Sequence, residues 1–239
     1  MARILLNARR ITPRYAYSGW ISGLRPATAP CNPSTTRHSV RGGISGPEQL
    51  RASSSTLQGI SFDVVVVGGG NAGFSAATSA AQAGAKRVLV VDKCPEAWAG
   101  GNTFFTAGAY RTVFDGLADI MTVVKGIDRS LASRIDMEPY TEEDFQHDID
   151  RVTAGRADPV LSGVLVRGSR SAIQWLAEIG IPFNLSFHRQ AYENTETRRF
   201  QFWGGMVLTV VDGGKGLVAA HRKAAAAHGV RVEYGGFTL

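Results

Sequence analysis

The fold of this chain is decided by residues 62–84, which read FDVVVVGGGNAGFSAATSAAQAG. Residues 62–67 are a β-branched run, which predicts a strand buried on both faces of a parallel sheet. Residues 72–83 predict a helix of small side chains, ended by Gly84 in the C-cap position. Residues 86–91, KRVLVV, predict a second buried strand. These three elements make a βαβ unit, whose crossover should be right-handed.

The glycines of this unit have different physical tasks. Gly68 permits the tight turn, Gly70 lets the backbone approach a pyrophosphate, and Gly73 lets the helix pack closely on the sheet. The free N–H groups at the helix start, with the positive end of its dipole, would hold the phosphates. Asp92 lies 24 residues after Gly68, near the spacing of an acid that hydrogen-bonds ribose hydroxyls. The pattern therefore predicts dinucleotide binding rather than a glycine turn that binds nothing.

A second polar turn follows the second strand. Residues 99–111 read AGGNTFFTAGAYR, in which Gly100 and Gly101 allow close backbone approach. Asn102 and Thr103 supply short hydrogen-bonding side chains. Ligands bind outside the carboxyl ends of strands in open α/β sheets, so this turn is a candidate binding loop. The alternative is a plain surface loop.

Apolar periodicity in the remaining chain predicts a helical insertion and one more strand. Helices are expected near residues 141–154, 158–179 and 214–228, and residues 180–185 are expected to be extended. Residues 230–234, VRVEY, predict a third buried strand beside the second. The fold class is therefore α/β, with a Rossmann-like three-stranded parallel sheet in the order 3-2-1. The second of these helices carries apolar residues at helical spacing: Val160, Leu161, Val164, Leu165, Ile173, Leu176 and Ile179.

Charge is distributed unevenly along the chain. Residues 1–58 contain eight arginines, no lysine and one acid, Glu48, for a net charge of +7. The other residues contain 18 basic and 19 acidic side chains, for a net charge of −1. The basicity belongs to a tail, so the part from residue 59 onward has no electrostatic case for binding nucleic acid.

The tail, residues 1–58, is rich in Arg, Ser, Thr and Pro, which is typical of a mitochondrial transit peptide. A location in the mitochondrial matrix follows from that interpretation, and a cytoplasmic one from its alternatives. Those alternatives are a disordered basic tail and upstream sequence read from a wrong start. Residues 59–239 form the second predicted domain, and no apolar run in the chain approaches the length of a membrane span.

The positions of the cysteines and histidines argue against disulfide bonds and metal sites. Cys31 and Cys94 have no CxxC partner, and no histidine cluster has zinc-like spacing. Disulfide and metal sites are therefore not expected. His221 and His228 are seven residues apart on one predicted helix, and a solvated helix face is expected for both.

Several motifs in order carry a family resemblance. They are VVVVGGGNAG, VLVVDK, GGNT, GRADP, WLAEIGIPF, QFWGG and GGKGLV. Together they resemble the fumarate reductase and succinate dehydrogenase flavoprotein family of FAD-dependent oxidoreductases, nearest to the tricarballylate dehydrogenase type. The resemblance covers about residues 62–234. It implies that residues 59–239 are the N-terminal part of an FAD-binding domain, ending before a substrate-capping domain.

The resemblance also implies which residues contact FAD. Those expected at the pyrophosphate are Gly68, Gly70, Asn71, Ala72 and Gly73. Asp92 is expected at the adenosine ribose, with Lys93 beside it. Those expected along the flavin and its ribityl chain are Gly101, Asn102, Thr103, Ala107 and Gly108. Asn102 stands near where the succinate dehydrogenase branch has the histidine that attaches FAD, so the flavin should be non-covalent.

The sequence is compatible with two alternative functions. The first is an FAD-dependent dehydrogenase or reductase that transfers hydride to or from a carboxylate- or carbonyl-bearing small molecule, in tricarboxylate or secondary metabolism. The second is a non-catalytic flavin-binding remnant or a partner subunit, working with a complementing chain or oligomer. The family's substrate-binding Arg and His residues lie in later parts, so no catalytic residue is assigned. The GGNT turn and the helical insertion argue against an NAD(P)-linked enzyme.

Overall fold

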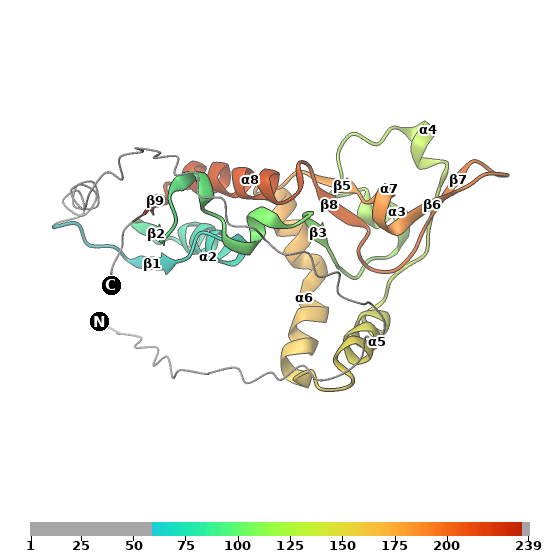
Figure 1. Cartoon of the computed structure of the whole chain (residues 1–239), viewed down its shortest axis with the longest axis horizontal. Coiled ribbons are helices and arrows are strands. Elements are labelled where there is room, and N and C mark those ends of the chain that lie inside the picture. Colours follow the sequence, from blue (N-terminus) through green and yellow to red (C-terminus); the bar gives the residue numbers. More distant parts are fainter. Residues whose placement is uncertain (1–58, 236–239) are drawn as a thin grey trace, which may run out of the picture. The chain divides into compact units, whose positions relative to one another are not determined.

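The computed structural model describes residues 59–235 of the chain. The predicted basic tail or transit peptide, residues 1–58, lies outside the described residues, and so does Cys31. The elements are shown in Figure 1 with the labels used below. Among residues 59–235, none of the helices has the length and apolar content that crossing a membrane requires.

A parallel sheet forms the dinucleotide-type part of the fold. Its strands are β1 (Val64–Val67), β2 (Val88–Asp92) and β9 (Arg231–Tyr234), hydrogen-bonded in the order β1-β2-β9. Val66 pairs with Val90, and Val90 pairs with Val232. The predicted 3-2-1 order is therefore confirmed.

Two helices pack against one another and against this sheet (Figure 1). They are α2 (Asn71–Gln82) and α8 (Gly213–Ala227), both close to their predicted ranges. Small side chains allow the close approach, since alanine supplies five of the 12 residues of α2 and six of the 15 residues of α8. The shared core consists of Phe74, Ala77, Val88, Val90, Ala225 and Val230.

The expected burial of the first strand on both faces is wrong. β2 is buried along its whole length, but Val65 and Val67 of β1 are 53% and 69% exposed. β1 is an edge strand of this sheet, and only the face toward α2 is covered within the described residues. Strand periodicity of two then places alternate residues in solvent.

The helical insertion consists of α5 (Glu142–Thr153) and α6 (Pro159–Glu178), as expected. Local signals begin both helices. The Thr141 side chain and Asp144 form a capping box at α5. The Asp158 carboxylate accepts hydrogen bonds from the backbone N–H groups that open α6, where Pro159 occupies the first turn.

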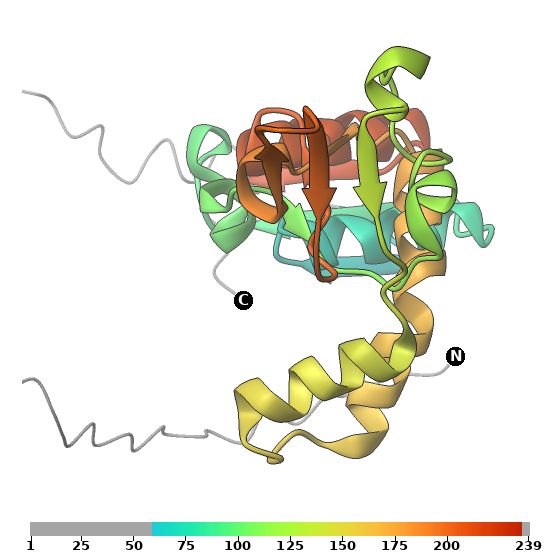
Figure 2. The same cartoon turned by 90° about the vertical axis from the view of Figure 1, so that its right-hand side faces the viewer.

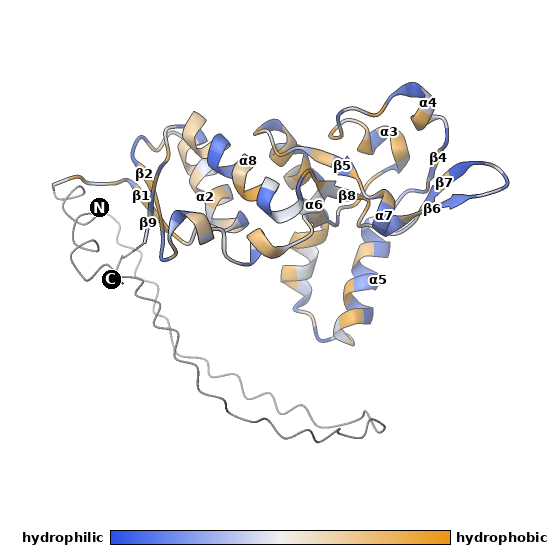
Figure 3. Cartoon of the chain, turned by 45° about the horizontal axis from the view of Figure 1, so that its top comes forward, coloured by the Kyte–Doolittle hydropathy of each residue, from blue (hydrophilic) through white to orange (hydrophobic). Residues whose placement is uncertain are grey.

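The apolar face expected along α6 is only half buried. Ile173 and Leu176, in the C-terminal half, belong to the core, whereas Leu161 is 71% exposed. The N-terminal half of α6 extends away from the sheets, and α5 is the helix that packs beside it (Figure 2). Figure 3 shows the same ribbon coloured by the hydropathy of each residue.

Two further small sheets connect these parts. One contains β3 (Ala109–Tyr110), β8 (Leu208–Val210) and β5 (Phe183–Leu185), all antiparallel, and β5 matches the expected extended segment. The other contains β4 (Ile135–Met137), β7 (Arg199–Phe202) and β6 (Ala191–Asn194).

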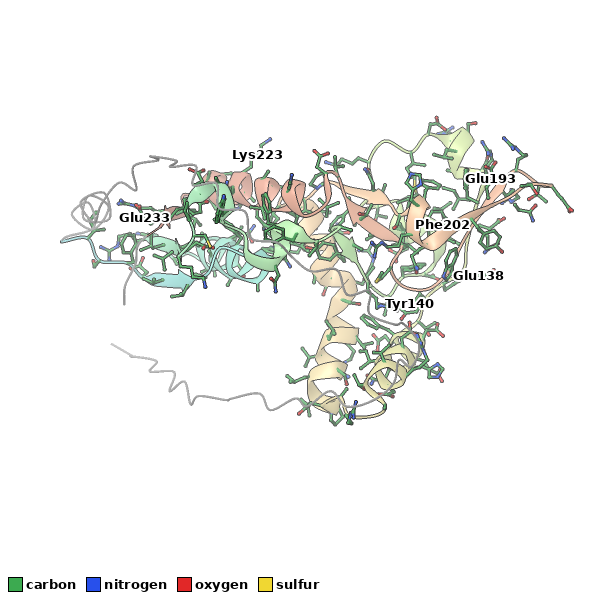
Figure 4. All side chains as sticks on the ribbon, in the orientation of Figure 1. Glu138, Tyr140, Glu193, Phe202, Lys223 and Glu233 are labelled. Atoms are coloured by element: carbon green, nitrogen blue, oxygen red, sulfur yellow. The ribbon has the colours of Figure 1, made fainter. Side chains whose placement is uncertain are left out.

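Short helices complete the described residues. They are η1 (Glu96–Trp98), η2 (Gly101–Phe105), α3 (Gly116–Ile120), α4 (Arg129–Ala132) and α7 (Phe187–Gln190). The larger core lies beneath these elements and includes Ile120, Phe183, Phe202 and Leu208, each at most 2% exposed. Figure 4 labels Phe202 within it.

Candidate functional site

The glycine turn between β1 and α2 is held in one conformation by steric limits. Gly68 has a φ of 104°, which L side chains rarely adopt. A Cβ on Gly73 would lie 1.8 Å from the Gly68 carbonyl oxygen, so no other residue fits without moving the backbone. A Cβ on Gly70 would lie 3.5 Å from both the Gly100 carbonyl oxygen and the Thr103 hydroxyl. Gly70 therefore leaves open a space that a side chain would fill, as a bound pyrophosphate requires.

Backbone N–H groups at the start of α2 are the donors at this space. No side chain caps the helix at Gly70. The Asn71 N–H donates to the Thr103 hydroxyl at 3.0 Å. Within the described residues, the N–H groups of Ala72 and Gly73 have no hydrogen-bond partner, as is usual in the first turn of a helix. The donor set is the one that binds phosphate at helix N-termini.

Asp92 ends β2 beside the same turn. Its carboxylate is 7% exposed and accepts hydrogen bonds from the Gly69 N–H at 2.8 Å and the Cys94 N–H at 2.9 Å. It therefore ties the glycine turn to the end of the second strand. Each oxygen keeps a further lone pair, which is what a ribose hydroxyl needs. Lys93 is exposed.

Helix α8 packs tightly against the second polar turn through its glycines. The Gly214 N–H donates to the Thr106 carbonyl oxygen at 2.8 Å. A Cβ on Gly214 would lie 2.1 Å from the Thr103 carbonyl oxygen, and one on Gly108 would lie 3.1 Å from the Gly213 backbone. The GGKG motif thus lets a helix begin directly behind the turn, which holds that turn against α2.

A cavity of about 270 Å³ lies between the start of α2, the second polar turn, β3 and α8. Its lining residues are Asn71, Asn102, Thr103, Thr106, Gly108, Ala109, Tyr110 and Leu217. Two predicted binding segments therefore meet in one cavity. In the sequence, 28 residues lie between Asn71 in the glycine turn and Gly100 in the second polar turn.

Not every predicted residue reaches this cavity. Gly101 and Ala107 are exposed in the same turn. Tyr110 and Leu217 line the cavity, but sequence reasoning did not single them out. Tyr110 could have been predicted as a lining residue, because it lies two residues after Gly108 in the AGGNTFFTAGAYR segment.

His221 contradicts the expected solvated face. It is 0% exposed, and its ring is stacked on Phe74 with the ring centroids 5.9 Å apart. Its Nε2 atom lies 2.7 Å from the Asn71 side-chain oxygen. His228 is exposed as expected, and Lys223 points away from α8 into solvent in Figure 4. Helical spacing could have predicted the burial of His221, because His221 lies four residues after the buried Leu217 and so on the same helix face.

Burial changes the acid–base properties of two residues beside the cavity. It lowers the pKa of His221 to about 4, so this imidazole is neutral at physiological pH. Burial also raises the pKa of Tyr110 to about 12, and the phenol therefore stays a hydrogen-bond donor. The Tyr110 hydroxyl donates to the Asn71 side-chain oxygen at 2.9 Å.

A second polar cluster lies away from the cavity and joins α5 to the body. The Arg111 guanidinium donates to the Tyr140 hydroxyl at 2.6 Å and pairs with Asp148. Hydrogen bonds from Arg151 and Tyr140 lower the pKa of Asp148 to about 2. A Cβ on Gly205 would lie 2.2 Å from the Tyr140 ring, so the QFWGG motif makes room for this tyrosine (Figure 4). We interpret this cluster as structural.

Comparison with known proteins agrees with this geometry. The family described as FAD dependent oxidoreductase matches residues 63–179. The fumarate reductase (cytochrome) of Shewanella frigidimarina is 35% identical over 120 residues, which are 49% of this chain and 18% of that relative. The chain thus matches less than a fifth of the curated relative's length.

Solved structures give a similar result at the level of fold. The 3-ketosteroid-Δ4-(5α)-dehydrogenase of Rhodococcus jostii RHA1 has a TM-score of 0.50 and 23% identity, over 76% of this chain and 40% of that one. An open-conformation flavocytochrome c3 fumarate reductase has a TM-score of 0.49 and 24% identity, over 79% of this chain and 29% of that one.

The cofactor of the matched family is FAD, and the site fits it. The fit rests on the space at Gly70, the unpaired N–H groups of the α2 first turn, and the cavity beside them, where short polar side chains meet apolar ones. The resemblance drawn from the ordered motifs is confirmed at the level of the family. The chain is therefore similar to FAD-dependent oxidoreductases over residues 63–179, and the relative that it matches at 35% identity is named a fumarate reductase.

Proposed function

We propose that the chain is the FAD-binding part of an oxidoreductase that acts on a carboxylate- or carbonyl-bearing small molecule. The observation that carries this proposal is the meeting of the glycine turn and the GGNT turn at one cavity. When bound, FAD supplies the hydride acceptor or donor of such a reaction. The relative from Shewanella is named a fumarate reductase, and that name supports a dicarboxylate as the first substrate to test. Tricarboxylate or secondary metabolism remains the proposed setting.

The chain's own residues would bind and orient the cofactor. The free N–H groups at the start of α2 would hold its pyrophosphate. Asn71, Asn102 and Thr103 would donate or accept hydrogen bonds within the cavity that they line. Leu217 supplies an apolar wall there, which helps to exclude water. Asp92 would accept from the adenosine ribose with the lone pairs that Gly69 and Cys94 leave free.

We propose that the flavin is held without a covalent bond. Asn102, which stands near where a related branch attaches FAD through histidine, has no nucleophilic atom. Tyr110 lines the cavity, but burial raises its pKa to about 12 and so keeps the phenol protonated. Denaturation should therefore release all of the flavin.

A second candidate function is supported by the chemistry of the cavity lining. Tyr110 is the only titratable side chain among the residues that line it. A reduction of a carbon–carbon double bond also needs a proton donor, and none with a pKa near neutrality lines the cavity in the described part of the chain. The alternative proposal is therefore a flavin-binding chain that works with a complementing chain.

Anaerobic spectroscopy of the purified chain with FAD separates these functions. Succinate should bleach the flavin absorbance of a dicarboxylate dehydrogenase, and fumarate should reoxidise the dithionite-reduced flavin. A 4-ene-3-ketosteroid provides the carbonyl-bearing comparison, suggested by the name of the Rhodococcus protein. Bound flavin that none of these compounds oxidises or reduces would support the non-catalytic alternative. A folded chain that binds no flavin would contradict both.

We propose that residues 1–58 act as a mitochondrial import signal, on their net charge of +7 with a single acid. A fluorescent reporter carrying residues 1–58 should enter mitochondria in a eukaryotic cell. A matched fusion in which the arginines are replaced by glutamine should stay outside. Equal distribution of the two reporters would reject the import signal.

A further inference from the structure

Three residues from distant parts of the chain meet at one amide oxygen. Asn71 begins α2, Tyr110 belongs to β3, and His221 lies in the middle of α8. The Asn71 side-chain oxygen lies 2.9 Å from the Tyr110 hydroxyl and 2.7 Å from His221 Nε2. The backbone N–H of Asn71 is held as well, by the Thr103 hydroxyl at 3.0 Å.

Hydrogen-bond chemistry decides which way the amide points. His221 Nδ1 is buried and has no partner within the described residues. A buried N–H without an acceptor is rarer than a buried acceptor without a donor, so the proton belongs on Nε2. Nε2–H and the Tyr110 hydroxyl are then both donors, and they require an acceptor between them. The Asn71 oxygen faces inward and its NH₂ group faces the other way.

The two donors are themselves fixed by packing. The ring of His221 is stacked on Phe74 at an interplanar angle of 11°. The ring of Tyr110 packs edge-on against Phe183, with the centroids 5.3 Å apart. Both supporting phenylalanines are at most 2% exposed. The His221 and Tyr110 side chains therefore have little rotational freedom. The Asn71 amide that they hold is fixed as a result.

The remaining face of the amide belongs to the cavity. Asn71 is half-buried and lines the cavity, and its NH₂ group makes no hydrogen bond within the described residues. We propose that His221 and Tyr110 are positioning residues that turn the Asn71 NH₂ group toward the cavity, where it donates to an oxygen of the bound cofactor. The inference rests on the proposed FAD site and adds to it two residues that do not bind the cofactor through their own polar groups.

Binding measurements on a matched pair of variants test this role. His221→Met removes the donor, while His221→Gln has nearly the same size and keeps a donor near Nε2. We expect His221→Met to weaken FAD binding about tenfold, as loss of one oriented hydrogen bond does, and His221→Gln to restore most of it. His228→Met, at an exposed position of the same helix, should leave the dissociation constant unchanged.

A double-mutant cycle then shows whether His221 acts through Asn71. Asn71→Ala should weaken FAD binding by at least the same factor. In that background His221→Met should change the dissociation constant less than twofold, because no amide remains to orient. Independent, multiplying losses would overturn the proposal, as would equal losses for His221→Met and His221→Gln.

A measurement without cofactor checks the orientation on its own. Nitrogen-15 NMR of the imidazole in the apo chain, assigned with His221→Gln, should show the proton on Nε2 at pH 7. A proton on Nδ1 would overturn the proposal even if FAD binds. A chain with the expected tautomer that binds no FAD would instead contradict the proposed function and remove the acceptor for Asn71.

Discussion

His221 is a base that folding removes from water, and this has a consequence for stability. Its pKa is about 4 in the folded chain, against 6.5 in an exposed imidazole. Below pH 6.5 the unfolded chain takes up a proton that the folded chain does not, so stability falls as the pH falls. The loss occurs between about pH 6.5 and pH 4, and it amounts to about 3 kcal/mol. Above pH 7 both states are neutral and the contribution is constant.

Chemical denaturation at several pH values checks this prediction. The free energy of unfolding of the wild-type chain should fall more steeply between pH 6.5 and pH 4 than that of His221→Gln, which has no titrating ring. His228→Gln is the control, because that ring is exposed. Parallel curves for wild type and His221→Gln would show that His221 is not kept neutral by burial.

Substitution by alanine should destabilise the chain at one helical glycine and stabilise it at another. At Gly73 the new Cβ would lie 1.8 Å from the Gly68 carbonyl oxygen, and this clash can be relieved only by moving the backbone. We expect Gly73→Ala to cost about 3 kcal/mol or more and to abolish flavin binding. At Gly168, in α6, nothing lies within 4 Å of the new Cβ. Gly168→Ala should therefore stabilise the chain by about 0.5–1 kcal/mol.

Thermal unfolding of these two variants against wild type measures both effects. A Gly73→Ala chain with unchanged stability would mean that the glycine turn relaxes easily, and the argument for a rigid phosphate site would fail.

At the scale of elements, α6 has two halves with different roles. Leu176 is 5% exposed in the core, whereas Leu161 is 71% exposed on the part that extends beside α5. Leu176→Ala should destabilise the chain by about 2–4 kcal/mol. Leu161→Ala should change stability by less than about 0.5 kcal/mol. Urea denaturation measures both, and similar losses would show that Leu161 is covered in solution.

Which elements could be predicted follows from where their signals lie. The ends of α5 and α6 were predictable because Thr141, Asp158 and Gly180 are local caps. The strands β3, β4 and β8 were not, because each has two or three residues and is defined by a partner far along the chain. The exposed face of β1 was missed because a β-branched run does not say whether a second layer covers it.

The same distinction applies to the candidate site. Asn71, Asn102 and Thr103 belong to glycine turns whose residue types indicate ligand contact, and they line the cavity. His221 could not be linked to Asn71 from the sequence, because 150 residues separate them. Its burial was within reach of helical spacing, but its partner depends on how α8 packs behind α2.

At the scale of the molecule, the cavity is assembled from three separated segments. The glycine turn supplies backbone donors, the GGNT turn supplies short polar side chains, and α8 holds the two together from behind. We therefore propose that residues 59–235 assemble a site selective for FAD.

Isothermal titration of the purified chain with FAD, and separately with NAD⁺, measures this selectivity. We expect one FAD bound per chain, released in full on denaturation, and no measurable binding of NAD⁺. A folded chain that binds no FAD, or one that binds NAD⁺ more tightly than FAD, would contradict it.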